Sequence, residues 1–345
     1  GMKCRQFNPF FAKCGYFGEA VSLVYPAKIL LCYPQRIFTP VPHPKRGKES
    51  GNLRICLHMA INWYPGHMHK ANKEMTEIIP EVDLVIELLD CRLPYSSQNP
   101  AIARLGRDKP RIKILSKSDL ADPAVTTLWQ DYLENTDSVK TLLTTLDQAD
   151  KAQKLLQLIH KLIRQKSKSR PHRLAMITGI PNVGKSTLIN AAAGRKVAKT
   201  GNEPAITKGL QKIRINDDII VLDTPGILWP KIHNVNSGYR LAASGAIRST
   251  ATEVEDLAFY LSGFLLEQYA ERLADRYKLA TTPSSGLEFL EQLGAKRGCL
   301  RGGGQVDLEK VSTILLNEFR AGMLGRISLE TPAMIEAEEK VIAKK

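Results

Sequence analysis

Short apolar runs alternate with longer stretches of helical spacing along most of the chain. From about residue 59 onward, four runs have the length of buried strands, at residues 82–89, 112–115, 139–143 and 174–178. Two further strands are predicted at residues 211–215 and 219–222, and the polar residues between them are typical of a hairpin turn. This alternation predicts an α/β domain with a mixed, mostly parallel sheet.

Helical spacing replaces this alternation beyond about residue 244. Apolar residues recur at helical intervals in residues 254–277, 286–293 and 308–324, which predicts a separate helical domain. We therefore expect an extension at residues 1–58, an α/β domain at 59–240, a helical domain at 241–330 and a tail at 331–345. The tail is rich in Ala, Glu and Lys, and it is expected to be a frayed helix.

Composition describes an ordinary globular chain, and charge points to an anionic partner. The 345 residues are 43% hydrophobic, as in proteins with a buried core. The net charge of +14 favours nucleic acid or an acidic membrane surface, because Lys and Arg that neutralise phosphates release condensed counterions. No apolar run reaches the roughly 18 to 20 residues that span a bilayer. We therefore expect a soluble protein with no membrane partner.

The first 58 residues differ from the rest of the chain. They hold nine lysines and arginines against two acids, together with four of the six cysteines. These cysteines lack the paired spacing of a zinc site, and the overall cysteine usage suits a reducing cytosol. Two interpretations stay open: an organellar transit peptide, or a start codon assigned ahead of the true start at Met59. We expect a bacterial cytoplasmic protein, and a mitochondrial one only if residues 1–58 are a transit peptide.

The strongest chemical signal is the sequence GIPNVGKST at residues 179–187, which follows a predicted strand and opens a predicted helix. This is the context of a phosphate-binding loop, in which glycines let successive N–H groups converge on phosphate oxygens. Lys185 is expected to reach the terminal phosphates and the Ser186 hydroxyl to ligate Mg²⁺. The expected nucleotide contacts are Asn182, Val183, Gly184, Lys185, Ser186 and Thr187.

A second motif, Asp223-Thr-Pro-Gly226, ends the next predicted strand. A carboxylate at this point can hold magnesium through water, and the Gly226 N–H can meet the γ-phosphate. Thr207 lies between the two motifs and is predicted to close on the magnesium ion in the triphosphate state. The pattern therefore predicts a Mg²⁺ site formed by Ser186, Thr207 and Asp223.

Guanine recognition requires a carboxylate that accepts hydrogen bonds from two guanine N–H groups that adenine lacks. Such a motif is found upstream of the phosphate loop, where Ser116-Lys-Ser-Asp119 ends a predicted strand. Asp119 is expected to read the base, Lys117 to cover its plane and Ser116 to brace the loop. Thr144 and Thr145 end the next strand and are expected to form a second base-side loop. The motif order is circularly permuted, and it favours GTP because ATP would leave the carboxylate unpaired.

These residues resemble the circularly permuted GTPases of the YlqF type, also called ribosome biogenesis GTPase A. The likeness runs from about Met59 to Arg326, and its further marks are Trp63-Tyr-Pro-Gly-His-Met68 with Lys70 and Ala71, Asp90-Cys-Arg-Leu-Pro-Tyr-Ser-Ser97, and Asp223-Thr-Pro-Gly-Ile-Leu-Trp-Pro230. The resemblance implies a circularly permuted, Ras-like phosphate-loop domain followed by a small all-helical domain. It also implies a GTP hydrolase that acts in assembly of the large ribosomal subunit. In this family the helical domain is expected to contact ribosomal RNA.

Catalysis needs a group that orients the attacking water. Ras-like enzymes use a glutamine after the second motif, but this chain has Ile227, which cannot form a hydrogen bond through its side chain. The resemblance implies His67 as a catalytic residue beside Lys185, because a histidine of near-neutral pKa can orient or deprotonate water. It also implies that Asn182 ligates K⁺, whose charge would replace that of an arginine finger.

The predicted helical domain carries basic residues around a turn of three glycines at residues 302–304. Arg297, Arg301 and Arg320 are expected to bind RNA backbone, and no DNA partner is expected. Because the segment after the second motif runs into this domain, we expect the affinity for the ribosomal subunit to depend on GTP.

Three other classes of protein are less well supported by the sequence. A phosphate-loop kinase for small molecules would have no use for a guanine carboxylate. An RNA-binding scaffold with weak or vestigial nucleotide hydrolysis is favoured by Ile227 and Ser116, but the intact Lys185, Ser186 and Asp223 argue against it. A GTPase acting on a membrane or on transfer RNA is unsupported, because there is no basic amphipathic helix and no extra catalytic domain.

Overall fold

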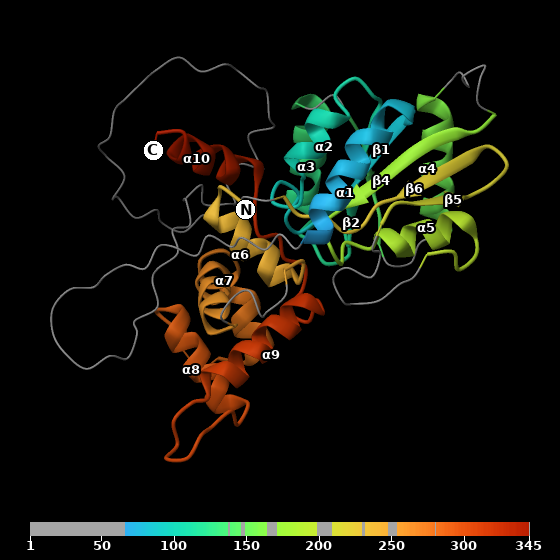
Figure 1. Cartoon of the computed structure of the whole chain (residues 1–345). Helices are drawn as coiled ribbons and strands as arrows, with labels where there is room; N and C mark the ends of the chain where they lie inside the picture. The colour runs from blue at the N-terminus through green and yellow to red at the C-terminus, as the bar shows by residue number, and fades with distance from the viewer. Residues whose placement is uncertain are drawn as a thin grey trace, which may run out of the picture. The chain divides into compact units, whose positions relative to one another are not determined.

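The computed structural model describes residues 66–136, 139–145, 149–163, 171–198, 209–229, 232–247, 254–279 and 281–344. Its one sheet has six strands in the order β3-β2-β1-β4-β6-β5 (Figure 1). The strands are β1 Leu84–Asp90, β2 Arg111–Ser116, β3 Lys140–Leu143, β4 Arg173–Gly179, β5 Gln211–Arg214 and β6 Ile219–Asp223. The helices are α1 Gly66–Ile78, α2 Pro100–Leu105, α3 Pro123–Thr136, α4 Ala149–Leu162, α5 Lys185–Ala193, α6 Val235–Ser244, α7 Val254–Tyr277, α8 Gly286–Lys296, α9 Leu308–Arg320 and α10 Pro332–Ile342, with the 3-10 turn η1 Ile79–Glu81 between α1 and β1.

The predicted mixed sheet is confirmed. Strands β1, β2, β3, β4 and β6 pair with one another in parallel, and β5 pairs antiparallel with β6. The β5–β6 hairpin turns at Asn216, whose side-chain oxygen accepts hydrogen bonds from the backbone N–H groups of Asp218 and Ile219. Every residue of β1 is buried, as expected for a central strand covered on both faces.

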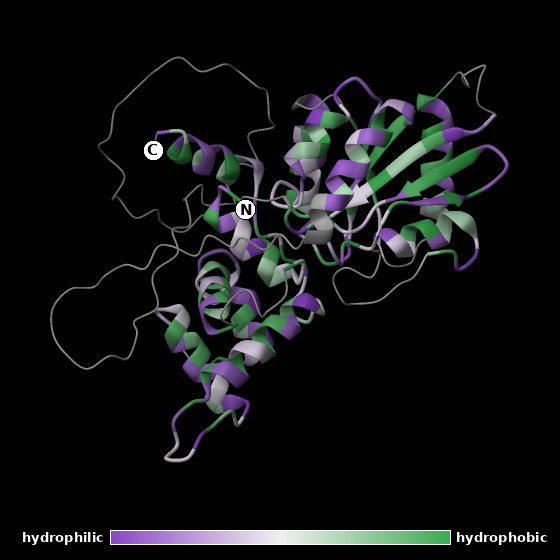
Figure 2. Ribbon diagram, viewed as in Figure 1, coloured by the Kyte–Doolittle hydropathy of each residue, from purple (hydrophilic) through white to green (hydrophobic). Residues whose placement is uncertain are grey.

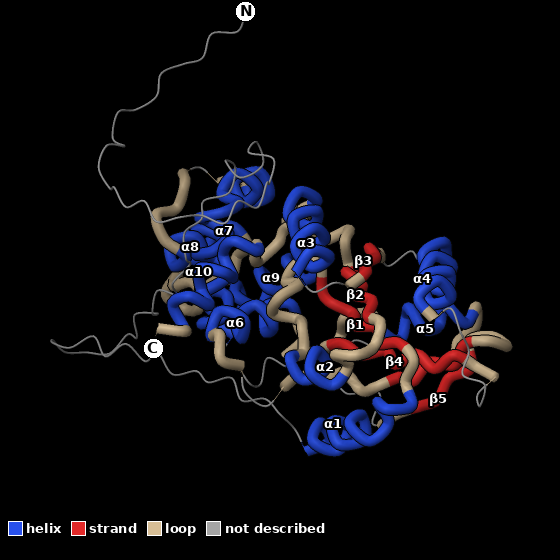
Figure 3. Tube along the Cα trace, turned by 90° about the horizontal axis from the view of Figure 1, so that it is seen from above, coloured by secondary structure: helices blue, strands red, loops and turns tan. Residues whose placement is uncertain are grey.

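Helices cover both faces of the sheet. Figure 3 shows α1 on one side of the sheet and α4 and α5 on the other. Leu155 and Ile159 of α4 and Leu188 of α5 line one small apolar space together with Ile86 and Ile177 of the sheet. This packing explains the amphipathic pattern of α4, and it fixes the helix that begins at the phosphate loop.

The carboxyl-terminal half is helical, as predicted. Helices α7, α8 and α9 pack around buried aromatic residues, among them Phe264, Phe289 and Phe319. The predicted helix 308–324 is too long, since α9 ends at Arg320. Gly322 follows with φ 74°, a left-handed conformation that ends a helix and that glycine adopts most readily. The expected domain boundary between residues 240 and 241 falls inside α6.

The tail forms a helix, as expected, but this helix is capped and packed and not frayed. Residues 332–342 form α10, and the Thr331 side chain caps it by accepting a hydrogen bond from the N–H of Met334. Met334, Ile335 and Glu338 are all buried. The hydrophobic pattern did not predict this packing, because the buried Glu338 interrupts the row of apolar residues on the helix. No helix in the described part of the chain is both long enough and apolar enough to cross a membrane.

Candidate nucleotide site

Four motifs meet at one edge of the sheet because parallel strands end on the same side. In the strand register Asp90 lies opposite Ser116, Leu88 opposite Gly179, and Ile177 opposite Asp223. The strand ends of β1, β2, β4 and β6 therefore form a continuous row. This row brings the SKSD motif of residues 116–119 to the same edge as the phosphate loop, although about sixty residues separate them in sequence.

The phosphate loop joins β4 to α5. Gly184 has φ 97° and Asn182 has φ 60°, so two residues adopt left-handed conformations within one short turn. Gly179 has no room for a side chain, because a Cβ there would lie 2.8 Å from the carbonyl oxygen of Leu88. Val183 is buried in the core. The loop is therefore held by the sheet below it, and its backbone N–H groups open onto the start of α5.

Lys185 and Asp223 face each other across this loop. Lys185 Nζ donates a hydrogen bond to Asp223 Oδ1 at 2.5 Å, and both side chains are buried. The second carboxylate oxygen, Oδ2 of Asp223, is also buried and has no hydrogen-bond partner among the described residues. Ser186 and Thr187 are half-buried in the first turn of α5. Two of the predicted residues, Lys185 and Asp223, are thus in contact, and Ser186 follows directly in the chain.

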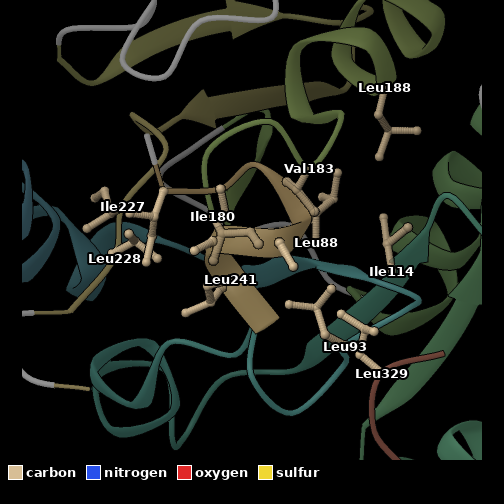
Figure 4. Close-up of a cluster of buried hydrophobic side chains, with 14 of the residues drawn as sticks. Leu88, Leu93, Ile114, Ile180, Val183, Leu188, Ile227, Leu228, Leu241 and Leu329 are labelled. Carbon is tan, nitrogen blue, oxygen red and sulfur yellow. The ribbon is translucent and has the colours of Figure 1, made fainter. Parts of the chain in front are cut away.

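The Asp223–Gly226 segment is fixed against the phosphate loop. The Thr224 hydroxyl donates a hydrogen bond to the Ile177 carbonyl at 3.0 Å, and the Ile227 N–H donates to the Gly179 carbonyl at 3.2 Å. A Cβ on Gly226 would lie 2.9 Å from Cα of Pro181. Figure 4 shows Ile227 within the buried apolar cluster, where its side chain packs against other hydrophobic residues of the core.

The two predicted base-side loops also contact each other. The N–H and hydroxyl of Ser118 both donate hydrogen bonds to the Thr144 carbonyl, at 3.0 and 3.1 Å. The Ser116 hydroxyl donates to the Leu89 carbonyl at 2.9 Å, which braces the loop from below. Oδ1 of Asp119 is buried and has no hydrogen-bond partner within the described ranges. Thr145 follows Thr144 and is half-buried.

Sequence reasoning assigned no role to a pair of residues beside this loop, Asp90 and Arg92. The Asp90 carboxylate accepts hydrogen bonds from Arg92 Nε at 2.9 Å, Arg92 Nη2 at 2.8 Å and Lys117 Nζ at 3.0 Å. Burial alone would raise the pKa of Asp90, but the two cations outweigh it and hold that pKa far below its ordinary value. Lys117, with φ 56°, is thereby anchored. The signal that could have revealed this pair is the charge of Asp90 at the end of an apolar, buried strand.

The remaining predicted residues lie elsewhere or outside the described residues. The backbone of His67 is in the first turn of α1, and its side chain lies outside the described residues, as does the whole of Thr207. Asn182 Nδ2 donates a hydrogen bond to the Gly245 carbonyl at 2.9 Å. In the helical part, Arg297 pairs with Glu318 and Arg301 pairs with Asp307.

Arg320 has a structural contact in this fold. Its Nε and Nη2 donate hydrogen bonds to the Ala243 and Ala242 carbonyls, both at 2.9 Å, at the carboxyl end of α6. Burial lowers the pKa of Arg320, and Arg92 adds to this effect. Each of the three predicted RNA-binding arginines therefore has a partner within the protein.

Comparison with known proteins agrees with this geometry. A family model described as "50S ribosome-binding GTPase" matches residues 174–275. Ribosome biogenesis GTPase A of Priestia megaterium is 42% identical over 290 residues, covering 81% of this chain and 99% of that protein. Ribosome biogenesis GTPase A of Thermotoga maritima is 32% identical, covering 79% and 95%. Mitochondrial ribosome-associated GTPase 1 of Mus musculus is 31% identical, covering 82% and 95%.

Solved structures show the same fold. The chain resembles GNP-bound YlqF from T. maritima with a TM-score of 0.55 at 25% identity, covering 76% of this chain and 98% of that one. GDP-bound YlqF gives a TM-score of 0.54 at 24% identity. Both likenesses fit the circularly permuted order of the motifs along the sheet. The chain therefore belongs to the ribosome biogenesis GTPase A family, and it is a GTPase.

Proposed function

We propose that this GTPase binds GTP and Mg²⁺ at the carboxyl edge of its sheet and assists assembly of the large ribosomal subunit, binding rRNA in a GTP-dependent manner. One observation carries the nucleotide-binding part of the proposal. Asp119 on the base side and Asp223 on the phosphate side each keep a buried carboxylate oxygen without a partner in the described part of the chain. Buried polar atoms are rarely left unpaired, so each oxygen is suited to a ligand.

On the base side, Asp119 would accept hydrogen bonds from guanine, and Lys117 would cover the ring. Ser116, Thr144 and Thr145 would shape the loop around the base. The contact between the two loops at Ser118 and Thr144 supports this arrangement, because it ties the reading carboxylate to a fixed backbone. Adenine offers no donor pair to Asp119, and a buried carboxylate left unpaired costs about 1–3 kcal/mol or more.

On the phosphate side, Ser186, Thr207 and Asp223 would hold Mg²⁺. Two hydroxyls and one carboxylate suit magnesium, which is commonly bound by one or two carboxylates together with nucleotide phosphates and water. Within the described residues no group of three His, Cys, Asp or Glu side chains could hold a metal without such a nucleotide. The ion would supply charge neutralisation on the phosphates. Lys185, now paired with Asp223, would turn to the terminal phosphates, and Asn182, Val183, Gly184, Thr187 and Gly226 would contact the nucleotide from the two loops.

His67 would act as the catalytic residue. Because α1 ends beside the start of β1, its first turn points back towards the carboxyl edge of the sheet (Figure 1). The burial of Ile227 in the core supports the need for another water-positioning group. We expect His67→Ala to lower turnover with little change in GTP affinity, measured by single-turnover hydrolysis; unchanged turnover would rule the role out.

Asn182 would ligate K⁺ through Oδ1, since its Nδ2 donates to the Gly245 carbonyl. Potassium would then stabilise charge that develops on the phosphates. Hydrolysis should be faster in potassium than in sodium salts. Equal rates in both would remove this assignment.

The ribosomal role rests on the relatives, whose names describe ribosome biogenesis and ribosome association. We infer a cytoplasmic protein in a bacterium, and Arg297, Arg301 and Arg320 as RNA contacts of the helical part. The Asp223–Gly226 segment leads into α6, and the Arg320 side chain is bonded to the end of α6. Through this connection, a change at the γ-phosphate would alter the position of the helical part.

Sedimentation with purified large ribosomal subunits tests the proposal. The protein should co-sediment in a non-hydrolysable GTP analogue and be released in GDP, and the affinity should fall as salt rises. Co-sedimentation that is equal in both nucleotides would contradict the switch. Tight, nucleotide-independent binding with no measurable hydrolysis would favour the scaffold alternative.

A further inference from the structure

Positive charge is distributed unevenly along the chain. Residues 151–200 contain twelve lysines and arginines and no aspartate or glutamate. Residues 254–345, the helical part, contain twelve basic residues against fourteen acidic ones. Apart from residues 1–58, the excess of positive charge therefore belongs to the α/β part of the molecule and not to the helices.

Part of this charge lies at the edge of the sheet opposite the nucleotide site. Helices α4 and α5 run antiparallel to the strands, so their carboxyl ends reach the amino ends of β4 and β6 (Figure 1). The β5–β6 turn lies at the same edge, because Arg214 pairs with Ile220 near the start of β6. Figure 2 shows this turn as strongly hydrophilic.

Side-chain contacts connect the ends of these elements into one surface. Arg195, just after α5, donates a hydrogen bond from Nη2 to the Arg214 carbonyl at 3.4 Å. Arg214 in turn pairs with Asp217 at 3.0 Å in the hairpin turn. His160 near the end of α4 lies 3.2 Å from Asp218 of the same turn. We call Lys161, Arg195, Lys196 and Arg214 the basic edge.

The basic edge holds cations that the fold itself does not use. Its two neighbouring carboxylates are already engaged, Asp217 with Arg214 and Asp218 with Arg173. Lys161, Arg195 and Lys196 are exposed and form no ion pair with any described residue. The Arg195 guanidinium donates its hydrogen bond to the backbone carbonyl of Arg214 and not to a carboxylate. Gathering like charges is unfavourable by itself, so the arrangement favours an anionic partner.

The arginines of the helical part contrast with this surface. Arg297 and Arg301 are each paired with a carboxylate, and Arg320 is bonded to backbone carbonyls. An arginine already bonded within the protein gains less from a phosphate than a solvated one does, because the internal bond must be given up. On charge complementarity the basic edge is therefore the better phosphate-binding surface.

We propose that the basic edge binds the phosphate backbone of RNA in the ribosomal subunit, giving the chain a second RNA contact away from its helical part. This inference rests on the proposed function. The basic edge consists of exposed lysines and arginines at the ends of helices and of a hairpin. Such residues suit contacts to phosphates, which position a protein on RNA without reading the base sequence. The contact lies at the end of the sheet opposite the GTP site, so it requires no nucleotide-driven movement.

The test compares two triple variants of the full chain. One removes three charges from the basic edge, as Lys161→Gln, Arg195→Gln and Lys196→Gln. The control removes three exposed charges elsewhere, as Lys73→Gln, Lys340→Gln and Lys344→Gln. Affinity for purified large ribosomal subunits is measured over a series of KCl concentrations, together with thermal unfolding and subunit-free GTP hydrolysis to confirm intact folding.

We expect the basic-edge variant to bind at least about tenfold more weakly and to lose about one unit of the log–log salt slope per phosphate contact removed. The control should bind as the wild type does. A basic-edge variant with the affinity and slope of the control would overturn the inference while leaving the proposed function intact. A wild-type protein that does not bind subunits would overturn both.

A second probe separates RNA from an anionic membrane. Vesicles of equal parts phosphatidylglycerol and phosphatidylcholine are offered to the same variants. Loss of vesicle binding with unchanged subunit binding would assign the basic edge to lipid and overturn the RNA assignment. Weaker subunit binding, in a variant that hydrolyses GTP normally by itself, supports it.

Discussion

At the scale of single residues, the Asp90 carboxylate determines how Lys117 is held. Asp90→Asn keeps the shape but leaves the Arg92 and Lys117 cations without their shared counter-charge. Removing one partner from a buried pair costs about 3–5 kcal/mol, so we expect a loss of that order in the free energy of unfolding at neutral pH. GTP affinity should fall as well, because Lys117 loses its anchor at 3.0 Å.

The pH dependence of this loss has a defined sign. The pKa of Asp90 is lower in the folded than in the unfolded chain, so its stabilisation is complete above the unfolded value of about 4 and is lost as pH falls towards the folded value. The difference in unfolding free energy between wild type and Asp90→Asn should therefore stay constant between pH 7 and about pH 5, and it should shrink from there to pH 3 in urea titrations. Asp108→Asn, at an exposed position, is the control and should show no such trend.

Base selectivity is a second property of a single residue. Asp119→Asn replaces an acceptor by an amide whose NH₂ can donate, so guanine loses a partner while the 2-oxo group of xanthine gains one. We expect GTP affinity to fall roughly 10- to 100-fold and XTP affinity to rise, measured by competition binding. The exposed Asp131→Asn serves as the matched control. If the GTP-to-XTP preference stayed the same, Asp119 would not be the base-reading residue.

At the scale of elements, the Asp223–Gly226 segment is a rigid partner of the phosphate loop. A methyl group in Gly226→Ala would meet the Pro181 backbone at 2.9 Å to Cα and 3.1 Å to N, and neither atom can move aside without shifting the loop. We expect single-turnover hydrolysis to fall about 10- to 100-fold, since a displacement of this size spoils alignment at the phosphates. In Gly302→Ala the new methyl group meets nothing within 4 Å, so the rate should not change.

The pattern of apolar residues predicted most of these elements for a physical reason. Buried parallel strands such as β1 need continuous apolar runs, and the phosphate loop needs glycines at fixed positions, so both leave a local signal. The end of α9 was missed because it depends on the left-handed conformation of Gly322 rather than on hydrophobicity. The role of Asp90 depends on register with a neighbouring strand, which one-dimensional spacing does not report.

At the scale of the whole molecule, a buried ionic cluster joins α10 to the nucleotide domain. Arg240 of α6 pairs with Glu338 at 2.6 Å and lies 3.4 Å from Glu330, and all three side chains are buried. Glu330 in turn accepts hydrogen bonds from the backbone N–H groups of Tyr95 and Ser96, in the loop that follows β1. The carboxyl-terminal end of the described chain is thereby tied to the loop that follows Asp90, whose carboxylate anchors Lys117.

This cluster predicts that α10 belongs to one cooperative unit with the GTPase domain. Glu338→Ala would leave the Arg240 charge with only its longer contact to Glu330, and it would also remove the acceptor used by the side-chain amides of Asn234 and Asn236. We expect unfolding to remain a single transition that costs about 3–5 kcal/mol less than in the wild type, measured by chemical denaturation. Glu336→Ala, on the exposed side of the same helix, should change stability by less than about 0.5 kcal/mol. Equal, small effects of both substitutions would mean that α10 is only loosely attached and that its burial does not contribute to the stability of the GTPase domain.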